Sequence, residues 1–379
     1  MKILQASSYF YPHIGGVETH VLELSQNLLD MGHDVLVVCA QAPKSPPFQA
    51  LDGLSVFRLP ALDLPYIPYT WFLRRRLSPF KADVIHSHYP PPFMSYGAIK
   101  GLPQLPHVLT YHCDLELPDK IASLKIPNIA KKGIKHINMK LYLSSIMNSV
   151  QRIIATAESY ARTSQVLRDY PYTVIPNGIG LEAFDNSASE VCGERETKKV
   201  LFVGRLSAVK GIDYLIEAAK LVLAQQHDAT FVIVGRGEDE ERLKALAKGL
   251  GDRIKFCGHI SRQALLRLYR TSTVLVLPSF TRLEAFGVVL LEAMASETPV
   301  IASRIPGVLD VVGDGGMLVQ PRDPLQLASA ILEVLDDPKT ARAMGRDGRR
   351  RVERHYDWKI VSREIVNVYK AAIDAPTVS

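Results

Sequence analysis

Short apolar runs rich in β-branched residues alternate with longer helical patterns along the whole chain of 379 residues. The runs are apolar from end to end instead of at every second residue, which is typical of parallel strands covered by helices on both faces. The sequence therefore predicts an α/β protein with doubly wound sheets. The expected strands are KILQAS, HDVLVVCA, ADVIHSH, HVLTYH, RIIATA and TVIPNG, and then KVLFVGR, TFVIVGR, RIKFCGH, TVLVLPS and PVIAS.

The chain is too long for one ordinary core, because single cores stop growing near ~250–300 residues. Hydrophobic residues make up 47% of it and charged residues 22%, so a sizeable core can be buried. The polar segment from Asn186 to Lys199 interrupts the alternation before a fresh strand begins at Val200. We expect two tandem Rossmann-like domains, residues 1–180 and 181–357, that face one another across a cleft beyond the carboxyl ends of their strands.

Several classes of protein are disfavoured. The start MKILQASSYF lacks the features of a secretory signal, so we expect a cytoplasmic protein. No apolar run approaches the ~18 residues of a membrane span. Cys39, Cys113, Cys192 and Cys257 are scattered without a C-x-x-C pair, which indicates neither a disulfide framework nor a zinc site.

The stretch EAFGVVLLE, residues 284–292, places two carboxylates around the start of an apolar helix. The free N–H groups of that first turn suit a phosphate. Glu284 is expected in the loop after a strand, and Glu292 inside the helix. Because an unpaired buried carboxylate is costly, Glu292 needs a donor, which a ribose diol would supply. The alternative is a glutamate that faces solvent on an amphipathic helix.

Two cations in VGRLSAVKG follow another strand end. Arg205 and Lys210, after Gly204, could hold a diphosphate by fixed charge, a task for which other enzymes use a metal ion. The sequence has no Asp-x-Asp cluster, and we expect neither a metal nor a cofactor. The alternative is that both cations make surface salt bridges.

In the N-terminal half, Gly15 and Gly16 precede a helical pattern, which suits a close approach of backbone to a ligand or a tight turn. His112 follows the strand VLTY. His112 could orient a substrate or hydrogen-bond it, although a lone histidine after a strand is more often structural. We treat His86 and His88 as structural.

These motifs, in this order and with VIPNG at 174–178 and YDW at 356–358, resemble glycosyltransferase family 4, and the motif order is similar to that of phosphatidylinositol mannosyltransferases. The resemblance implies the two-Rossmann GT-B fold and a retaining, metal-independent transfer from a nucleotide-diphosphate sugar. It also implies a nucleotide held by the C-terminal domain, an acceptor held mainly by the N-terminal one, and a C-terminal helix, residues 358–379, that crosses back.

The same resemblance implies roles for single residues. Glu292 binds the ribose, Glu284 the hexose, and Arg205 with Lys210 the diphosphate, while His112 lies near the anomeric carbon. The catalytic set is then His112, Glu284, Arg205 and Lys210. The donor-binding set is Gly16, Gly204, Arg205, Lys210, Gly235, Arg236, His259, Ile260, Glu284, Ala285, Phe286, Gly287, Val288 and Glu292.

The acceptor is expected to meet basic, partly apolar patches. One comprises Lys131, Lys132 and Lys135 opposite a helical stripe of isoleucines, the other Arg74, Arg75 and Arg76, and Glu18 is a further candidate contact. With a formal net charge of +6, such patches favour an anionic membrane surface at the inner face of the membrane. The alternative is a helix packed on the sheet with solvated lysines.

The donor stays open between GDP-mannose, slightly favoured, and UDP-glucose or UDP-N-acetylglucosamine, the latter pair with a soluble acceptor. The loop CGHISRQ offers no carboxylate for guanine. A non-catalytic nucleotide-sugar sensor is a different class of function. A nicotinamide fingerprint fails because Glu240 takes its third glycine position, and nucleic acid is disfavoured because the basic patches lack interleaved aromatics.

Overall fold

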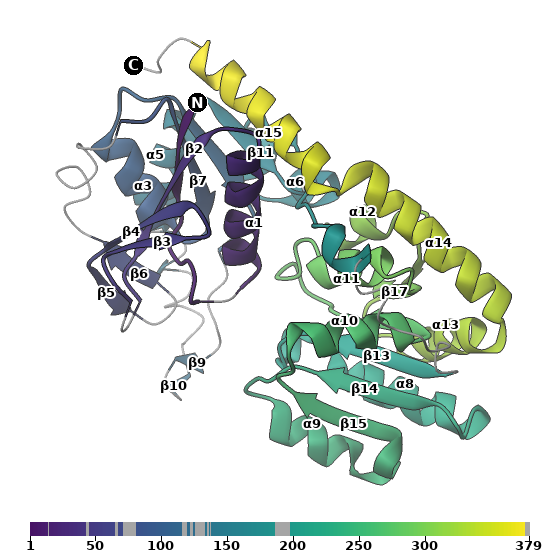
Figure 1. Cartoon of the computed structure of the whole chain (residues 1–379). Helices are drawn as coiled ribbons and strands as arrows, with labels where there is room; N and C mark the ends of the chain where they lie inside the picture. Colours follow the sequence, from purple (N-terminus) through teal and green to yellow (C-terminus); the bar gives the residue numbers. More distant parts are fainter. Residues whose placement is uncertain are drawn as a thin grey trace. The chain divides into compact units, whose positions relative to one another are not determined.

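A computed structural model describes residues 1–13, 15–42, 45–64, 67–70, 81–115, 120–121, 124–125, 133–134, 136, 138–185 and 198–375. The chain forms two compact units (Figure 1). Unit 1 comprises Met1–Thr156, Ala161–Gly178 and Trp358–Ser379, and unit 2 comprises Ala157–Tyr160 and Ile179–Asp357.

The short segment Ala157–Tyr160 belongs to unit 2, although the sequence placed it within the N-terminal range 1–180. Its Ser159 explains why. The backbone N–H and the hydroxyl of Ser159 donate to the Asp310 carboxylate at 2.8 and 2.7 Å, and the hydroxyl accepts from the N–H of Gly307 at 2.8 Å. Such side-chain bonds leave no periodic signal in the sequence.

Unit 1 contains an eight-stranded sheet in the order β12-β11-β8-β7-β1-β2-β4-β3, parallel except for the edge strand β3. The order reverses beside β1, which lies between β2 and β7. The strands are β1 (Lys2–Ala6), β2 (Asp34–Ala40), β3 (Phe48–Leu51), β4 (Leu54–Leu59), β7 (Val84–Tyr89), β8 (His107–Tyr111), β11 (Arg152–Ala155) and β12 (Thr173–Val174). Two hairpins stand apart from this sheet: β5 (Ala61–Leu64) with β6 (Ile67–Thr70), and β9 (Lys120–Ile121) with β10 (Leu124–Lys125).

Helices cover both faces of this sheet, which is why its strands are apolar throughout. Ile3 of β1 packs in a core with α1 (Gly16–Asp30) and α15 (Trp358–Ile373), while its neighbour Leu4 packs in a second core with α3 (Pro92–Gly101). Successive side chains of a strand point to opposite faces, so each residue must be apolar. The other helices of this part of the chain are a π-helix (Asn138–Leu143), α5 (Ser144–Ser149), α6 (Glu158–Thr163) and a 3-10 turn (Leu167–Asp169).

Unit 2 contains a fully parallel six-stranded sheet in the order β15-β14-β13-β16-β17-β18, which is the 3-2-1-4-5-6 order of the Rossmann fold. Its strands are β13 (Lys199–Val203), β14 (Thr230–Val234), β15 (Ile254–Gly258), β16 (Val274–Leu277), β17 (Val300–Ser303) and β18 (Met317–Val319). Its helices are α8 (Ile212–Gln225), α9 (Glu240–Ala247), α10 (Arg262–Thr271), α11 (Val288–Ala295), α12 (Val308–Val312), α13 (Pro324–Asp336) and α14 (Pro338–His355), with 3-10 turns at Ala208–Lys210 and Lys248–Arg253.

The prediction of doubly wound α/β units is therefore confirmed. The sequence missed the strands β3 to β6, β9, β10 and β18. Most of these have four residues or fewer, and in β4 the apolar residues are interrupted by Ser55 and Arg58. Within the described part of the chain, no helix is both long and apolar enough to cross a membrane.

Candidate active site

The chemistry predicted for unit 2 gathers where its strand order reverses, between β13 and β16. Gly204 and Arg205 follow β13 directly, and Ser279 lies just after β16. Because ligands of open α/β sheets bind beyond the carboxyl ends of the strands at such a point, these loops form the candidate site of the unit.

Lys210 and Glu284 form the central ion pair of this site. The Nζ of Lys210 lies 2.5 Å from Oε2 of Glu284, and the hydroxyl of Ser279 donates to the same oxygen at 3.0 Å. The Glu284 side chain is 12% exposed and that of Lys210 is 24% exposed. The carboxylate is thus fixed by one charged and one neutral donor, and it holds the ammonium group in place beside the strand end.

Glycines let the neighbouring loops approach one another closely. A Cβ at Gly211 would lie 2.1 Å from the carbonyl oxygen of Pro278, which joins the turn after β13 to the loop after β16. A Cβ at Gly235, whose φ is 131°, would lie 1.9 Å from the carbonyl oxygen of Gly204. Both contacts are too close for any side chain. Gly235, one of the predicted donor-binding residues, thus serves the packing of backbone against backbone.

Helix α11 begins beside the ion pair. Its N-cap Gly287 has a φ of 83°, in the left-handed region, and its carbonyl oxygen accepts from the N–H of Leu290 at 2.9 Å. The N–H groups of Val288 and Val289, which precede that first bond, have no acceptor within the helix, so with the helix dipole they favour an anion at this end. Phe286 is buried beneath the turn and fixes its position.

Glu292 lies further along α11, with its side chain 15% exposed. Its Oε2 accepts from the Tyr269 hydroxyl at 2.6 Å, and its Oε1 forms an ion pair with Arg262. The donor that the sequence indicated for Glu292 is thus supplied within the protein, because α10 provides two. The lone pairs left on the carboxylate can still accept from a diol.

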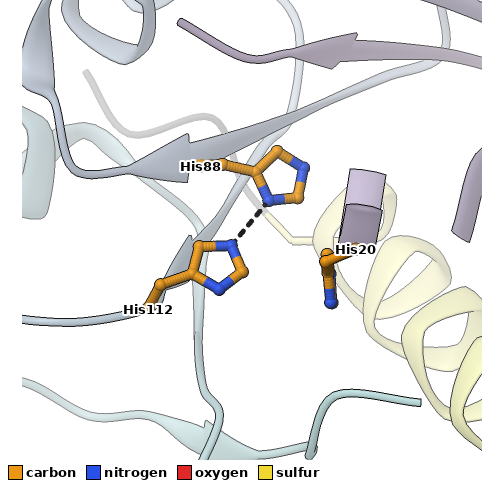
Figure 2. A group of neighbouring side chains, drawn as sticks. All are labelled: His20, His88 and His112. Atoms are coloured by element: carbon orange, nitrogen blue, oxygen red, sulfur yellow. Dashed lines mark hydrogen bonds between the residues drawn. The ribbon is translucent and has the colours of Figure 1, made fainter. Parts of the chain in front are cut away.

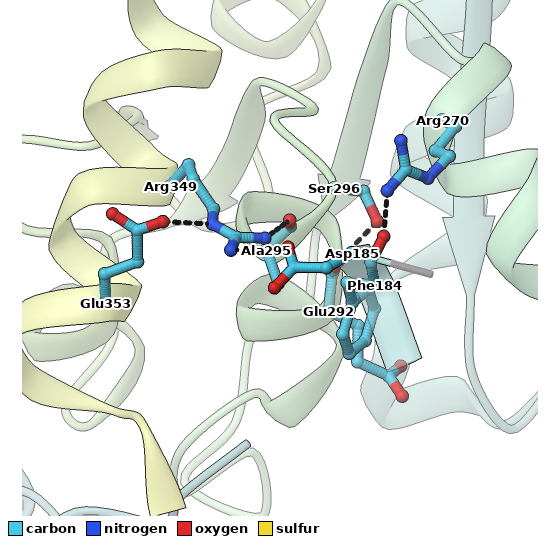
Figure 3. A network of polar contacts seen from close by, with 8 residues as sticks. All are labelled: Phe184, Asp185, Arg270, Glu292, Ala295, Ser296, Arg349 and Glu353. Carbon is cyan, nitrogen blue, oxygen red and sulfur yellow. Dashed lines mark hydrogen bonds and ion pairs between the residues drawn. The ribbon is translucent and has the colours of Figure 1, made fainter. Parts of the chain in front are cut away.

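Two arginines hold the segment 184–185, one linking it to the end of α11 and the other to α10 (Figure 3). Arg349 donates to the carbonyl oxygen of Ala295 and pairs with Asp185, both at 2.7 Å. Arg270 donates to the carbonyl oxygen of Phe184. The carbonyl oxygen of Ala295, at the end of the helix that carries Glu292, is thereby satisfied, which stabilises the helix end.

The remaining residues predicted to bind the donor lie nearer to solvent. Arg205 is 58% exposed and its guanidinium lies 3.3 Å from Glu238. Arg236 and His259 are exposed, and Ile260 is partly exposed. Arg205 is therefore positioned by the end of β13 and not by a buried partner.

In unit 1, His112 follows β8 and belongs to a buried cluster of histidines (Figure 2). Its Nε2 lies 3.1 Å from Nδ1 of His88, and its ring meets that of His20 edge-on at 5.0 Å between centroids. Burial lowers the pKa of His112 and of His88 well below 6.5, and that of His20 to about 4. Ring nitrogens of the three histidines lie within 4.8 Å of one another.

The glycine turn of unit 1 leads from β1 into α1. A Cβ at Gly15 would lie 2.3 Å from Oε2 of Glu18, whereas the space around Gly16 is open. Glu18 lies 3.3 Å from Nδ1 of His13. Gly16 is thus the first residue of α1, the helix that follows β1 along the chain.

Comparison with known proteins decides the family. The model of Glycosyltransferase Family 4 matches residues 14–183, and that of Glycosyl transferases group 1 matches residues 188–351. A phosphatidyl-myo-inositol mannosyltransferase of Mycolicibacterium smegmatis is 30% identical over 99% of this chain and 95% of its own. The chain belongs to glycosyltransferase family 4.

Solved structures show the same fold. A sucrose-phosphate synthase from Thermosynechococcus elongatus matches with a TM-score of 0.80 at 24% identity, covering 99% of this chain and 100% of that one. HepE of Anabaena, in complex with UDP-glucose, matches with a TM-score of 0.73 at 19% identity, covering 98% and 100%. The protein is therefore a GT-B glycosyltransferase, as the motifs predicted.

Some predicted residues of this glycosyltransferase cannot be placed. Arg74, Arg75, Arg76, Lys131, Lys132 and Lys135 lie outside the described residues. Their contact with an acceptor or membrane stays a prediction.

The sequence missed the partners that hold the site together. Ser279 and Tyr269 are such partners, and so is His20, which the sequence placed within a helical pattern without a role. His20 precedes Val21 and shares the buried face of α1 with Leu24 and Leu28. A histidine on an otherwise apolar stripe was the available signal.

Proposed function

We propose that this glycosyltransferase is a retaining hexosyltransferase that acts without a metal ion and uses GDP-mannose. Its acceptor is a hydroxyl of a lipid or glycan at an anionic membrane surface. The observation that carries the proposal is the ion pair of Lys210 and Glu284, partly shielded from solvent, at the strand-order reversal of unit 2, beside the free N–H groups of α11. A fixed ammonium group and a helix N-terminus together match a diphosphate.

In this mechanism the bond between the anomeric carbon and the diphosphate breaks, and the bond from the acceptor oxygen forms on the same face of the sugar. Lys210, Arg205 and the start of α11 stabilise the negative charge that develops on the leaving phosphate. A phosphate oxygen takes the proton of the acceptor hydroxyl, so no protein base is required. Glu284 accepts from sugar hydroxyls and keeps Lys210 in position. Glu292 accepts from the ribose.

The preference for GDP-mannose rests on the relative named a mannosyltransferase. UDP-glucose and UDP-N-acetylglucosamine with a soluble acceptor are the second candidates, because the described loop after β15, His259 to Ser261, contributes no carboxylate to guanine. The UDP-glucose complex of HepE supports a likeness of fold alone.

The membrane part of the proposal rests on the net charge of +6 and on apolar side chains near the predicted basic patch. Ile134 and Leu141 are 40% and 55% exposed. Exposed apolar groups beside lysines suit the interface of an anionic bilayer. We propose a peripheral protein at the cytoplasmic face.

One experiment tests the donor, the acceptor and the stereochemistry. The full chain is incubated with GDP-mannose, UDP-glucose or UDP-N-acetylglucosamine, each with phosphatidylinositol vesicles or a soluble glycan, with and without EDTA. We expect transfer of mannose to the vesicle lipid, unchanged by EDTA, with the anomeric configuration of the donor retained in the NMR spectrum of the product. Inversion, or loss of transfer with EDTA, would refute the mechanism.

A nucleotide-sugar sensor gives a different result. It binds a donor in calorimetry but shows neither transfer nor hydrolysis, and the variant Glu284→Ala then has no activity to lose. Vesicles of neutral lipid are the control for the membrane, since equal sedimentation with neutral and anionic vesicles would remove the electrostatic part of the proposal.

A further inference from the structure

A chain of hydrogen-bonded side chains runs through the interior of unit 1 to His112. The Tyr369 hydroxyl of α15 lies 2.7 Å from Nδ1 of His86 and 3.3 Å from the amide nitrogen of Gln5. The amide oxygen of Gln5 lies 3.0 Å from Nε2 of His88, whose Nδ1 lies 3.1 Å from Nε2 of His112. The chain therefore connects the C-terminal helix to the strand end that carries His112.

Every histidine in this chain of hydrogen bonds is neutral. The rings of His86, His88 and His112 are buried, and desolvation lowers the pKa of each well below 6.5, with further lowering by the neighbouring imidazoles. A neutral imidazole has one N–H group and one bare nitrogen. Each ring must therefore donate from one nitrogen and accept at the other.

The direction of the chain follows from Gln5. Its amide oxygen can only accept, so the proton of His88 is on Nε2 and its Nδ1 is bare. That bare Nδ1 accepts from His112, whose proton must then be on Nε2.

The other branch agrees with this direction. The amide nitrogen of Gln5 donates to the Tyr369 oxygen, which leaves the proton of the Tyr369 hydroxyl free to be donated to Nδ1 of His86. His86 then carries its proton on Nε2, which donates to the Thr110 hydroxyl oxygen at 2.7 Å. One consistent assignment satisfies the whole chain.

We propose that Gln5 and Tyr369 are positioning residues that fix His112 as the Nε2–H tautomer, so that its Nδ1 presents a lone pair to a substrate hydroxyl. In the described part of the chain Nδ1 of His112 has no hydrogen-bond partner, and it is not among the buried unpaired atoms. Figure 2 shows this nitrogen on the side of the ring that points away from His88. His112 thus accepts a hydrogen bond and does not deliver a proton. The role at a substrate rests on the proposed function, whereas the tautomer does not.

The tautomer is measured by NMR of the full chain labelled with ¹⁵N-histidine, without substrate. We expect the Nδ1 resonance of His112 in the range of unprotonated nitrogen and its Nε2 resonance in the range of protonated nitrogen, with the assignment made by the variant His112→Gln. The reverse pattern, with the proton on Nδ1, would overturn the proposal. So would a stoichiometric bound metal ion, because His88 and His112 would then both present bare nitrogens to it.

Variants test whether Tyr369 and Gln5 set the preference. In Tyr369→Phe and Gln5→Met, the donor-to-acceptor direction of the hydrogen bonds that lead to His112 is no longer fixed. We therefore expect both tautomers of His112 to be populated and its two ¹⁵N resonances to move toward one another. Tyr89→Phe is the matched control. It removes another buried hydroxyl of unit 1, which accepts from Nδ2 of Asn138 at 3.0 Å. This hydroxyl is not part of the hydrogen-bonded chain that leads to His112. An unchanged spectrum in Tyr369→Phe, or an equal change in Tyr89→Phe, would contradict the role of Tyr369.

Failure of this inference and failure of the proposed function are distinguishable. If the tautomer is as expected but no donor is turned over, only the proposed function fails. If transfer occurs while His112 carries its proton on Nδ1, only the positioning role fails.

Discussion

The two units place different kinds of polar groups where the strand order of their sheets reverses. In unit 2 the polar groups at the strand-order reversal are charged and paired, as in Lys210 with Glu284, and they are partly open to solvent. In unit 1 the corresponding groups are neutral histidines deep in the fold. Charge near the surface suits a diphosphate at moderate desolvation cost, whereas buried neutral donors and acceptors suit hydroxyl groups. We therefore expect unit 1 to be sensitive to acid pH and unit 2 to be sensitive to the loss of single charged groups.

The largest expected difference is acid unfolding of unit 1 alone. The five buried histidines of unit 1 have pKa values lowered by burial. The unfolded state therefore binds more protons once the pH falls below 6.5, and the free energy of unfolding decreases as pH falls from there toward the folded-state values. The slope is about 1.4 kcal/mol per pH unit per histidine, or about 7 kcal/mol for five, against a typical domain stability of about 5–15 kcal/mol. The histidines are His20, His86, His88, His107 and His112.

Unit 2 is the internal control, because its histidines His227, His259 and His355 are all exposed. Hydrogen exchange with mass spectrometry, pulsed at one fixed pH after incubation between pH 7.5 and 5, should show unit 1 peptides losing protection first. Simultaneous loss in both units, or earlier loss in unit 2, would show that the neutral cluster does not control acid stability.

The next largest effect is on catalysis. Lys210→Met removes the fixed positive charge that, in the proposed mechanism, stabilises the leaving phosphate. We expect kcat to fall about 10²- to 10³-fold, as on removal of one hydrogen-bond donor that stabilises a transition state. Lys198→Met is the matched control, since Lys198 also pairs with a carboxylate, that of Asp228, at 2.8 Å. Steady-state kinetics with whichever donor is turned over measure both. A similar fall in both variants would mean that the effect is general charge, not the position of Lys210.

The contrast also extends to what could be predicted. Uniformly apolar strands and the motif EAFGVVLLE revealed the fold class and the start of α11, because burial on both faces and helix geometry leave a local pattern. The partners of Glu292 could not be predicted. Tyr269 and Arg262 come from α10, more than twenty residues away along the chain, and only the packing of α10 against α11 brings them together.

The histidine cluster was partly visible in the sequence. His86 and His88 are two residues apart on β7, so their side chains lie on the same face of the sheet. Thr110 and His112 have the same spacing on the neighbouring strand β8 and just after it. Their dependence on Gln5 and on Tyr369, which is 364 residues away from Gln5, is a tertiary fact that no local pattern contains.

A smaller effect concerns the backbone of unit 2. Gly235→Ala would place a Cβ 1.9 Å from the Gly204 carbonyl oxygen at a φ of 131°, so the loop after β13 must shift. We expect the free energy of unfolding to fall by about 3 kcal/mol, with weaker donor binding. Gly249→Ala is the control, because open space surrounds that glycine. Denaturant titration measures both, and equal stabilities would contradict the close approach of the two loops.

The smallest effect tests whether Glu292 of unit 2 is held mainly by a charged partner or by a neutral one. Tyr269→Phe removes a buried neutral donor to Glu292, and we expect a loss of about 1.5–3 kcal/mol in unfolding free energy, typical of hydrogen bonds to charged groups. Arg262→Gln removes the charged donor, but that side chain is 49% exposed, so solvent screens the pair and the expected loss is under about 1 kcal/mol. Chemical denaturation of both variants gives the order. If the arginine variant loses more, the carboxylate on α11 is held by charge, as Glu284 is. The expected order would instead show that the neutral, buried type of contact found in unit 1 also positions Glu292 in unit 2.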